Sequence, residues 1–278
     1  MFTQVVNIPL AILWRGKLVL LLLFLLSGVS SAAHAAAAHN STGQSQHIIP
    51  GKVPDGLTGV EWDNIQAQIA AGPYKTYAAE PGGYVSANPA QGWQISYAPD
   101  GTTRLTPRDA AADTWQWGLQ LTGYGYEGDL SGFENLTGLQ PTLSAAGSTL
   151  TYRWDGNLSE WWHNDPTGLE QGFTLQTRPG QAQGPPLQLT LTISGDLVAR
   201  QVGQTITFLD KSGATAFTYD KLRVWDATGR TLPAYFRLQP TDASLHLLVD
   251  DRQATYPLTI DPLVQQASVK ASNQKFSI

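Results

Sequence analysis

Much of the chain alternates apolar and polar side chains in short runs separated by turn residues. The clearest run is residues 187–193, in which Leu or Ile occupies the odd-numbered positions and Gln188, Thr190 and Thr192 occupy the even-numbered ones. Because successive side chains of a β-strand point to opposite faces, this run predicts a strand with one apolar and one polar face. The pattern is typical of an antiparallel sheet with one face in water.

Similar short runs recur at roughly 8–12 residue spacing between turns that contain Gly, Pro or Asp. We expect strands at residues 93–97, 102–106, 150–154, 158–162, 173–178, 187–193, 205–209, 222–225, 234–238, 245–249 and 256–260. This spacing predicts an all-β fold, an antiparallel β-sandwich of two packed sheets. Residues 53–262 form this module, either as one sandwich or as two subdomains that meet near residues 138–148.

A single short helix is predicted near the start of the module. Residues 59–71 place Val60, Trp62, Ile65 and Ile69 near helical spacing, and Gly72 with Pro73 follows as a stop signal. We expect this N-terminal helix to pack on a sheet edge.

The first 35 residues have the three parts of a secretory signal peptide. Arg15 and Lys17 precede the apolar run LVLLLLFLL at residues 18–26, and a small-residue cleavage site ends at Ala35. The run is well short of the ~20 residues that a membrane-spanning helix needs, so we expect no membrane span after cleavage. Residues 36–52 are polar and small, which predicts a flexible leader. Residues 263–278 are interpreted as a C-terminal linker or as the truncated start of a repeat region.

Cysteine content and net charge indicate where the exported chain works and which partners it does not bind. The chain has no cysteine, which fits a bacterial exported protein better than a eukaryotic secreted one. Its formal charge is −5, and cleavage after Ala35 would remove two basic residues and no acidic one. We therefore expect a secreted or cell-surface bacterial protein that binds neither nucleic acid nor anionic membrane.

Residues that could support catalysis are not arranged for it. Glu160 and His163 flank two tryptophans, but on a strand at 158–163 Glu160 and Trp162 share one face while Trp161 and His163 share the other. General acid–base catalysis needs both groups at one substrate, so a structural role is favoured. No Gly-x-Ser-x-Gly elbow occurs. A glycan hydrolase needs two facing carboxylates, which could come from Glu127, Glu134, Glu160 or Glu170.

No metal or cofactor site is expected. Asp155 begins a pattern of oxygen ligands that resembles a calcium loop, but Pro166 occupies the position where a bidentate acid belongs. An ordinary hairpin turn is the better interpretation, and Asp250 with Asp251 is interpreted as a turn at a strand end. His34, His39 and His47 lie on the cleaved or flexible segments and have no fixed geometry.

A Gly-rich stretch offers the best candidate for ligand binding. Residues 123–138 are predicted to be a long loop, and its aromatic rings could stack on a sugar while nearby carboxylates accept from sugar hydroxyls. The candidate residues are Tyr124, Tyr126, Glu127, Asp129 and Phe133, with Asn135 beside them.

Three segments of the β region carry a family resemblance. They are EWWHNDPTGLEQGFTL at 160–175, LRVWDATGRTLPA at 222–234 and VDDRQATYPLTIDPL at 249–263. Together they resemble the N-terminal leader module of bacterial secreted FG-GAP repeat proteins, whose propeller repeat also occurs in integrin alpha chains. The resemblance spans about residues 57–260. The repeats themselves are absent, so it implies a truncated or free-standing leader, and no calcium ligand of a propeller carries over to this chain.

The sequence therefore predicts a non-catalytic exported β-sandwich, a structural or adhesion-type part of a bacterial surface protein. A carbohydrate-binding module is the alternative, and a glycan hydrolase is the third hypothesis. We expect an extracellular glycan or protein as ligand.

Overall fold

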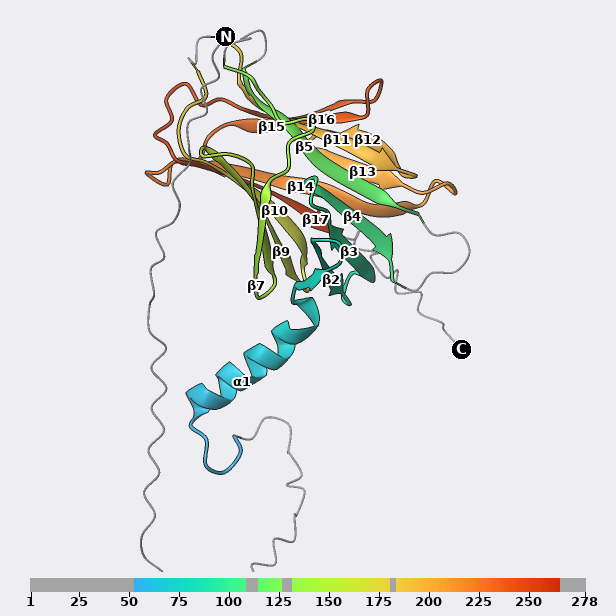
Figure 1. Ribbon diagram of the computed structural model, residues 1–278, viewed down its shortest axis with the longest axis vertical. Coiled ribbons are helices and arrows are strands. Elements are labelled where there is room, and N and C mark those ends of the chain that lie inside the picture. Colours follow the sequence, from blue (N-terminus) through green and yellow to red (C-terminus); the bar gives the residue numbers. More distant parts are fainter. Residues whose placement is uncertain (1–52, 109–114, 127–131, 181–183, 266–278) are drawn as a thin grey trace, which may run out of the picture. The chain divides into compact units, whose positions relative to one another are not determined.

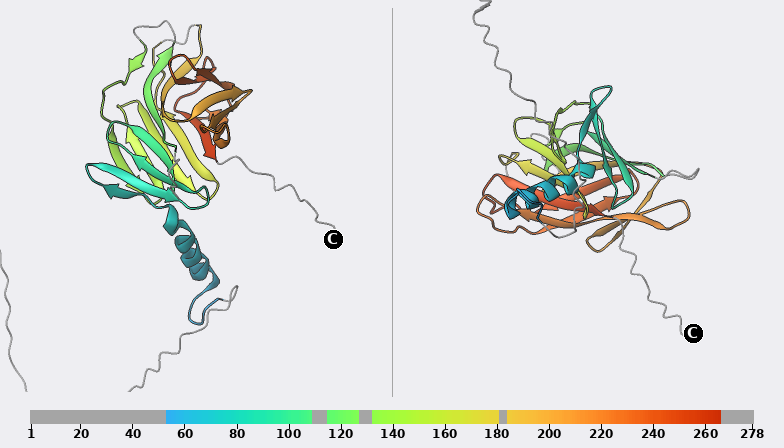
Figure 2. Two further views of the ribbon diagram at one scale, coloured as in Figure 1. Left: turned by 90° about the vertical axis from the view of Figure 1, so that its right-hand side faces the viewer. Right: turned by 90° about the horizontal axis from the view of Figure 1, so that it is seen from below.

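The computed structural model describes residues 53–108, 115–126, 132–180 and 184–265, which fold as two antiparallel sheets and one short α-helix. This confirms the predicted all-β sandwich of two sheets. Figures 1 and 2 show the two layers from three directions. The predicted signal peptide and flexible leader (1–52) lie outside the described residues.

The first sheet has nine strands and includes the N-terminal strand of the module. Its strand order is β1-β2-β3-β4-β5-β11-β16-β15, and β6 pairs with β5. Its strands are β1 (Tyr77–Ala79), β2 (Gly83–Asn88), β3 (Trp93–Tyr97), β4 (Thr102–Pro107), β5 (Trp117–Tyr126), β6 (Glu134–Asn135), β11 (Leu187–Gly195), β15 (Ala234–Gln239) and β16 (Ser244–Val249). Because β5 pairs with β11, strands from both sides of residues 138–148 belong to one sheet.

The second sheet has eight strands in the order β12-β13-β14-β17-β10-β9-β8-β7. Its strands are β7 (Thr142–Ala146), β8 (Thr149–Arg153), β9 (Leu158–Asp165), β10 (Gly168–Leu175), β12 (Val198–Val202), β13 (Thr205–Leu209), β14 (Thr215–Trp225) and β17 (Leu258–Gln265). β17 extends to Gln265 and so reaches three residues into the predicted C-terminal linker; the rest of that linker, residues 266–278, is not described.

The core lies between the two sheets and is rich in aromatic rings. Phe217 of β14 contacts Trp93, Trp117 and Phe208 with ring centroids 4.8–5.6 Å apart. Each such ring removes a large apolar area from water, a contribution of about 1.5–3 kcal/mol per side chain. The inward residues of β11 complete the core, since Leu187, Leu189 and Leu191 are fully buried, as the alternation predicts.

The helix α1 (Gly59–Ala71) has the predicted bounds but not the predicted packing. A capping box between Thr58 and Glu61 begins it, and Gly72 ends it. None of its side chains is buried, and Val60 and Ile69 are 72% and 68% exposed. The expected packing on a sheet edge is therefore wrong, and the caps rather than side-chain burial hold the helix ends.

The predicted loop at residues 123–138 is partly strand. β5 runs through Tyr126, and β6 pairs Glu134 and Asn135 with it. The prediction of a loop was wrong because glycine usually weakens or interrupts a strand, and this segment contains Gly123 and Gly125. Here each glycine admits a close neighbour: a Cβ on Gly123 would lie 2.7 Å from the Phe133 ring, and one on Gly125 would lie 2.4 Å from the Gly132 carbonyl oxygen.

Candidate functional site

The two candidate tyrosines lie in the core rather than on a loop. Tyr124 and Tyr126 are each only 2% exposed, and both point to the buried side of β5. Tyr124 donates to Asp155 Oδ2 at 2.8 Å, and Tyr126 donates to Asp251 Oδ2 at 2.5 Å. The expectation of two exposed rings is wrong, because the strand continues past Gly123 and turns both rings inward.

The other candidate residues of the Gly-rich stretch do not lie on one common surface in the described structure. Phe133 is partly exposed and packs over Gly123 on the outer side of β5. Glu127 and Asp129 lie outside the described residues. Asn135 is exposed, and its Oδ1 accepts from the backbone N–H of Thr137 at 2.9 Å, so it caps a turn. The structure therefore does not bring the predicted loop residues together into one surface.

Glu160 occupies the interior of the sandwich. It is 1% exposed, and its carboxylate accepts from Nε1 of Trp154 at 3.0 Å, Nε1 of Trp162 at 2.8 Å and Nε2 of Gln171 at 2.7 Å. Tyr219 in turn donates to Gln171 Oε1 at 2.5 Å. Burial raises the pKa of Glu160 to about 7, although the three donors oppose this rise. The group has no access to a substrate, which agrees with the structural role predicted for it.

The outward side of β9 carries an aromatic ring next to acidic and basic side chains. Trp161 and His163 share one face of β9, as predicted, and this face points outward, where both side chains are partly exposed. Register places Trp161 opposite Gly172 and His163 opposite Glu170 on β10. We call the surface formed by Trp161, His163, Glu170, Gly172, Arg223 and Asp261 the Trp161 face.

Strands β17 and β14 complete the Trp161 face. Glu170 lies opposite Leu263 of β17, and Arg223 of β14 lies opposite Asp261. Since Asp261 is two residues from Leu263, its side chain projects from the same side of the sheet as that of Glu170. Arg223 and Asp261 were not among the predicted site residues, because the strand order that brings them beside Trp161 leaves no local signal in the sequence.

The indole of Trp161 lies over a glycine. An ideal Cβ on Gly172 would be only 1.9 Å from Cζ2 of Trp161 and 2.0 Å from Cε2. The ring therefore occupies the space that any larger side chain at residue 172 would fill. One side of the indole rests on the sheet, and the partial exposure of Trp161 leaves apolar ring surface in contact with water.

Two carboxyl groups meet beside this ring. Burial and the neighbouring Glu170 carboxylate raise the pKa of Asp261 to about 7, while Arg223 opposes the rise. Like charges on diagonal cross-strand positions repel, so a proton held between the two groups relieves the repulsion. His163 is held at the other side of Glu170 by Thr149, whose Oγ1 lies 2.9 Å from His163 Nδ1.

Asp251 anchors a second polar cluster at the end of the first sheet. It is 1% exposed and accepts at Oδ2 from Tyr126, Tyr256 and Arg178 Nη1, at 2.5, 2.6 and 2.6 Å. Burial and the bond to Asp251 raise the pKa of Tyr126 to about 12, so the phenol keeps its proton and donates. Asp251 begins a turn, as interpreted from the sequence, because its carbonyl oxygen accepts from the N–H of Ala254 at 2.8 Å. Its side chain in addition joins β5 to the segments that carry Arg178 and Tyr256.

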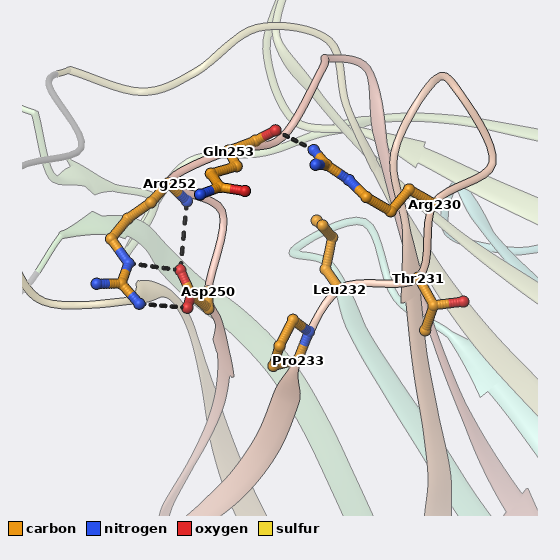
Figure 3. Close-up of a pocket in the computed structure, with 7 residues that line it drawn as sticks. All are labelled: Arg230, Thr231, Leu232, Pro233, Asp250, Arg252 and Gln253. Atoms are coloured by element: carbon orange, nitrogen blue, oxygen red, sulfur yellow. Dashed lines mark hydrogen bonds and ion pairs between the residues drawn. The ribbon is translucent and has the colours of Figure 1, made fainter.

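A pocket of about 380 Å³ lies near this cluster (Figure 3). It is lined by Arg230, Thr231, Leu232, Pro233, Asp250, Arg252 and Gln253. Its cations already have partners: Arg252 donates to both oxygens of Asp250, and Arg230 bonds the Asp226 carboxylate and the Gln253 carbonyl oxygen. The pocket is therefore a concave surface whose two arginines are already paired, so it has little free charge with which to bind an ionic ligand.

The described residues contain no group of three or more His, Asp or Glu side chains that could hold a metal ion. Asp155, which begins the calcium-like pattern, accepts at Oδ1 from the N–H groups of Asn157 and Leu158 at 2.7 and 2.6 Å. It thus caps the hairpin between β8 and β9, as the turn interpretation expects.

The fold defines the class as a two-sheet antiparallel β-sandwich. Comparison with protein-family models, with curated proteins and with solved structures finds no match to this chain. The FG-GAP resemblance thus remains a prediction from the three quoted segments. Within the described part of the chain, no helix has both the length and the apolar character needed to cross a membrane.

Proposed function

We propose that this chain is a non-catalytic, adhesion-type β-sandwich of an exported bacterial surface protein and that it binds a glycan on the Trp161 face. The observation that carries the proposal is the indole of Trp161 resting on Gly172 in the middle of a partly exposed polar sheet surface. A flat ring of this kind offers the apolar face of a pyranose a matching surface.

The groups around the ring have the chemistry that sugar hydroxyls need. Glu170 and Asp261 provide acceptor oxygens, and Arg223 and His163 provide donors. All of these project from adjacent strands of one sheet, so the backbone ladder fixes their spacing. A surface on rigid strands needs little ordering when a ligand binds, which favours affinity.

The arrangement supports binding rather than hydrolysis. Glycosidases hold their two carboxyl groups on opposite sides of the scissile bond. Glu170 and Asp261 instead project side by side from the same face of neighbouring strands. Among the other acids considered for hydrolysis, Glu160 is buried and Glu134 is exposed on β6.

The test is a binding titration of residues 36–278 against a panel of neutral polysaccharides and their hexasaccharides. Trp161→Ala should weaken binding at least about tenfold, since an aromatic anchor contributes roughly 1.5 kcal/mol or more. Tyr235→Ala is the matched control, because Tyr235 is 38% exposed but lies on β15 of the other sheet. Equal loss in both variants, or no binding by the parent, would remove the Trp161 face as a glycan site and leave the purely structural role.

A further inference from the structure

The Trp161 face contains two neighbouring acidic side chains, and among the described residues neither forms an ion pair with a basic side chain. Glu170 and Asp261 project from the same side of adjacent strands at diagonal positions. Neither carboxylate is joined to a cation by an ion pair in the described structure. Both side chains are partly buried, which makes two neighbouring charges more costly than in open water.

Other charged groups surround the pair without neutralising it. Arg223 faces Asp261 from β14, and His163 faces Glu170 from β9. Asp220 of β14 lies opposite Leu263, next to the pair, and adds a further negative charge. The pair is therefore set between one cation, one histidine and one more acid.

We infer that the crowding of two partly buried carboxyl groups makes Asp261 retain a proton beside the Glu170 carboxylate, and that loss of this proton weakens glycan binding at the Trp161 face. The regulation rests on the proposed function. The raised pKa of Asp261, about 7, agrees with the geometry of the pair.

The direction of the effect follows from linkage. A sugar ring on Trp161 excludes water from the adjacent carboxyl groups, and loss of water disfavours the charged form. Binding therefore takes up a proton, and the complex is tighter where the pair is already protonated. We expect the affinity for a neutral hexasaccharide to rise about three- to tenfold between pH 8 and pH 6.

Two measurements test the inference, and both use residues 36–278. Carboxyl-carbon NMR titration should show Asp261 with a pKa near 7 in the parent and a clearly lower one in Glu170→Gln. An ordinary Asp261 titration in the parent, or one that Glu170→Gln leaves unchanged, overturns the inference that Asp261 retains a proton because of Glu170.

The second measurement is the pH profile of binding to cellohexaose, chitohexaose and mannohexaose. Glu170→Gln should bind with an affinity that no longer changes between pH 6 and pH 8, whereas His163→Gln should keep the dependence. A dependence that disappears only in His163→Gln assigns it to the histidine and overturns the inference. If the parent binds a hexasaccharide with an affinity that does not change with pH, the proposed pH dependence is wrong but the proposed glycan binding stands. If the parent binds none of them at any pH, both proposals are wrong.

Discussion

Asn88 of β2 donates a hydrogen bond from Nδ2 to Oδ1 of Asn164 in β9, at 2.8 Å, and both side chains are fully buried. The two strands belong to different sheets. Asn164 also donates from Nδ2 to the carbonyl oxygens of Tyr74 and Ala87, at 3.0 and 2.9 Å. This pair therefore ties the sheets together by polar bonds at an edge of the apolar core.

Replacing Asn164 with Ala should destabilise the sandwich by about 3 kcal/mol. The change removes a donor from the buried carbonyl oxygen of Tyr74 and from the partly buried one of Ala87, and each unsatisfied group costs about 1–3 kcal/mol. The Asn88 amide keeps two backbone carbonyl oxygens as acceptors. Chemical denaturation measures the loss. Asn64→Ala, on the exposed surface of α1, is the control and should change stability by less than about 0.5 kcal/mol. A loss below about 1 kcal/mol for Asn164→Ala would contradict the role of the pair.

Glu160→Ala should cost about 3–5 kcal/mol, because Trp154, Trp162 and Gln171 would lose the oxygens to which they donate. Glu160→Gln should recover only part of this loss, since its amide group would face at least one N–H donor. The exposed Glu134→Ala provides the comparison.

The Glu160 carboxyl also predicts a pH dependence of stability. Its folded pKa of about 7 lies above the ordinary value of 4.5, so between these values the folded state binds more protons than the unfolded state. Stability must then fall as the pH rises through this window. The difference in unfolding free energy between the parent and Glu160→Gln should shrink from pH 4.5 to pH 7. A difference that stays constant would mean that Glu160 is charged throughout the window.

Arg178→Met and Arg252→Met contrast a buried with an exposed ion pair. Arg178 Nη1 lies 2.6 Å from Asp251, which is 1% exposed, whereas Arg252 Nη2 lies 2.6 Å from Asp250, which is 35% exposed. Removing the partner of a buried charge costs about 3–5 kcal/mol, while exposed pairs contribute about 0–1 kcal/mol. Thermal unfolding of the two variants should differ accordingly. Similar losses in both would show that solvent reaches Asp251.

The strands with clean alternation could be predicted from the sequence. The strands β7 and β12, which carry few large apolar side chains, and the glycine-containing end of β5 could not. Residues 187–193 alternate without interruption, and β11 covers them. The loop predicted from residue 123 overlaps the end of β5, because Gly123 and Gly125 resemble loop residues unless one knows that Phe133 and Gly132 occupy the space beside them. Alternation of apolar and polar side chains predicts a strand only where side chains are present, and glycine has none.

The candidate site shows the same limit at a longer range. Alternation along a strand predicts that Trp161 and His163 share a face, and the structure has both side chains on one face. The neighbours Arg223 and Asp261 come from β14 and β17, which the strand order places beside β10. Hydrophobic periodicity fixes the face on which a residue lies but not which strands are adjacent, so this cluster becomes visible only in the fold.

Gly172→Ala separates the position of the Trp161 ring from the presence of that ring. The added methyl would lie within 2.5 Å of three ring atoms and must displace the indole, whereas Gly156→Ala in the β8–β9 turn meets no atom within 4 Å. Gly172→Ala should therefore weaken glycan binding about as much as Trp161→Ala, while Gly156→Ala leaves it unchanged. Circular dichroism and a binding titration on the same samples check both. If Gly172→Ala keeps full affinity, the stacked position of the indole is not what the ligand recognises, and the ring on this glycine serves the sheet alone.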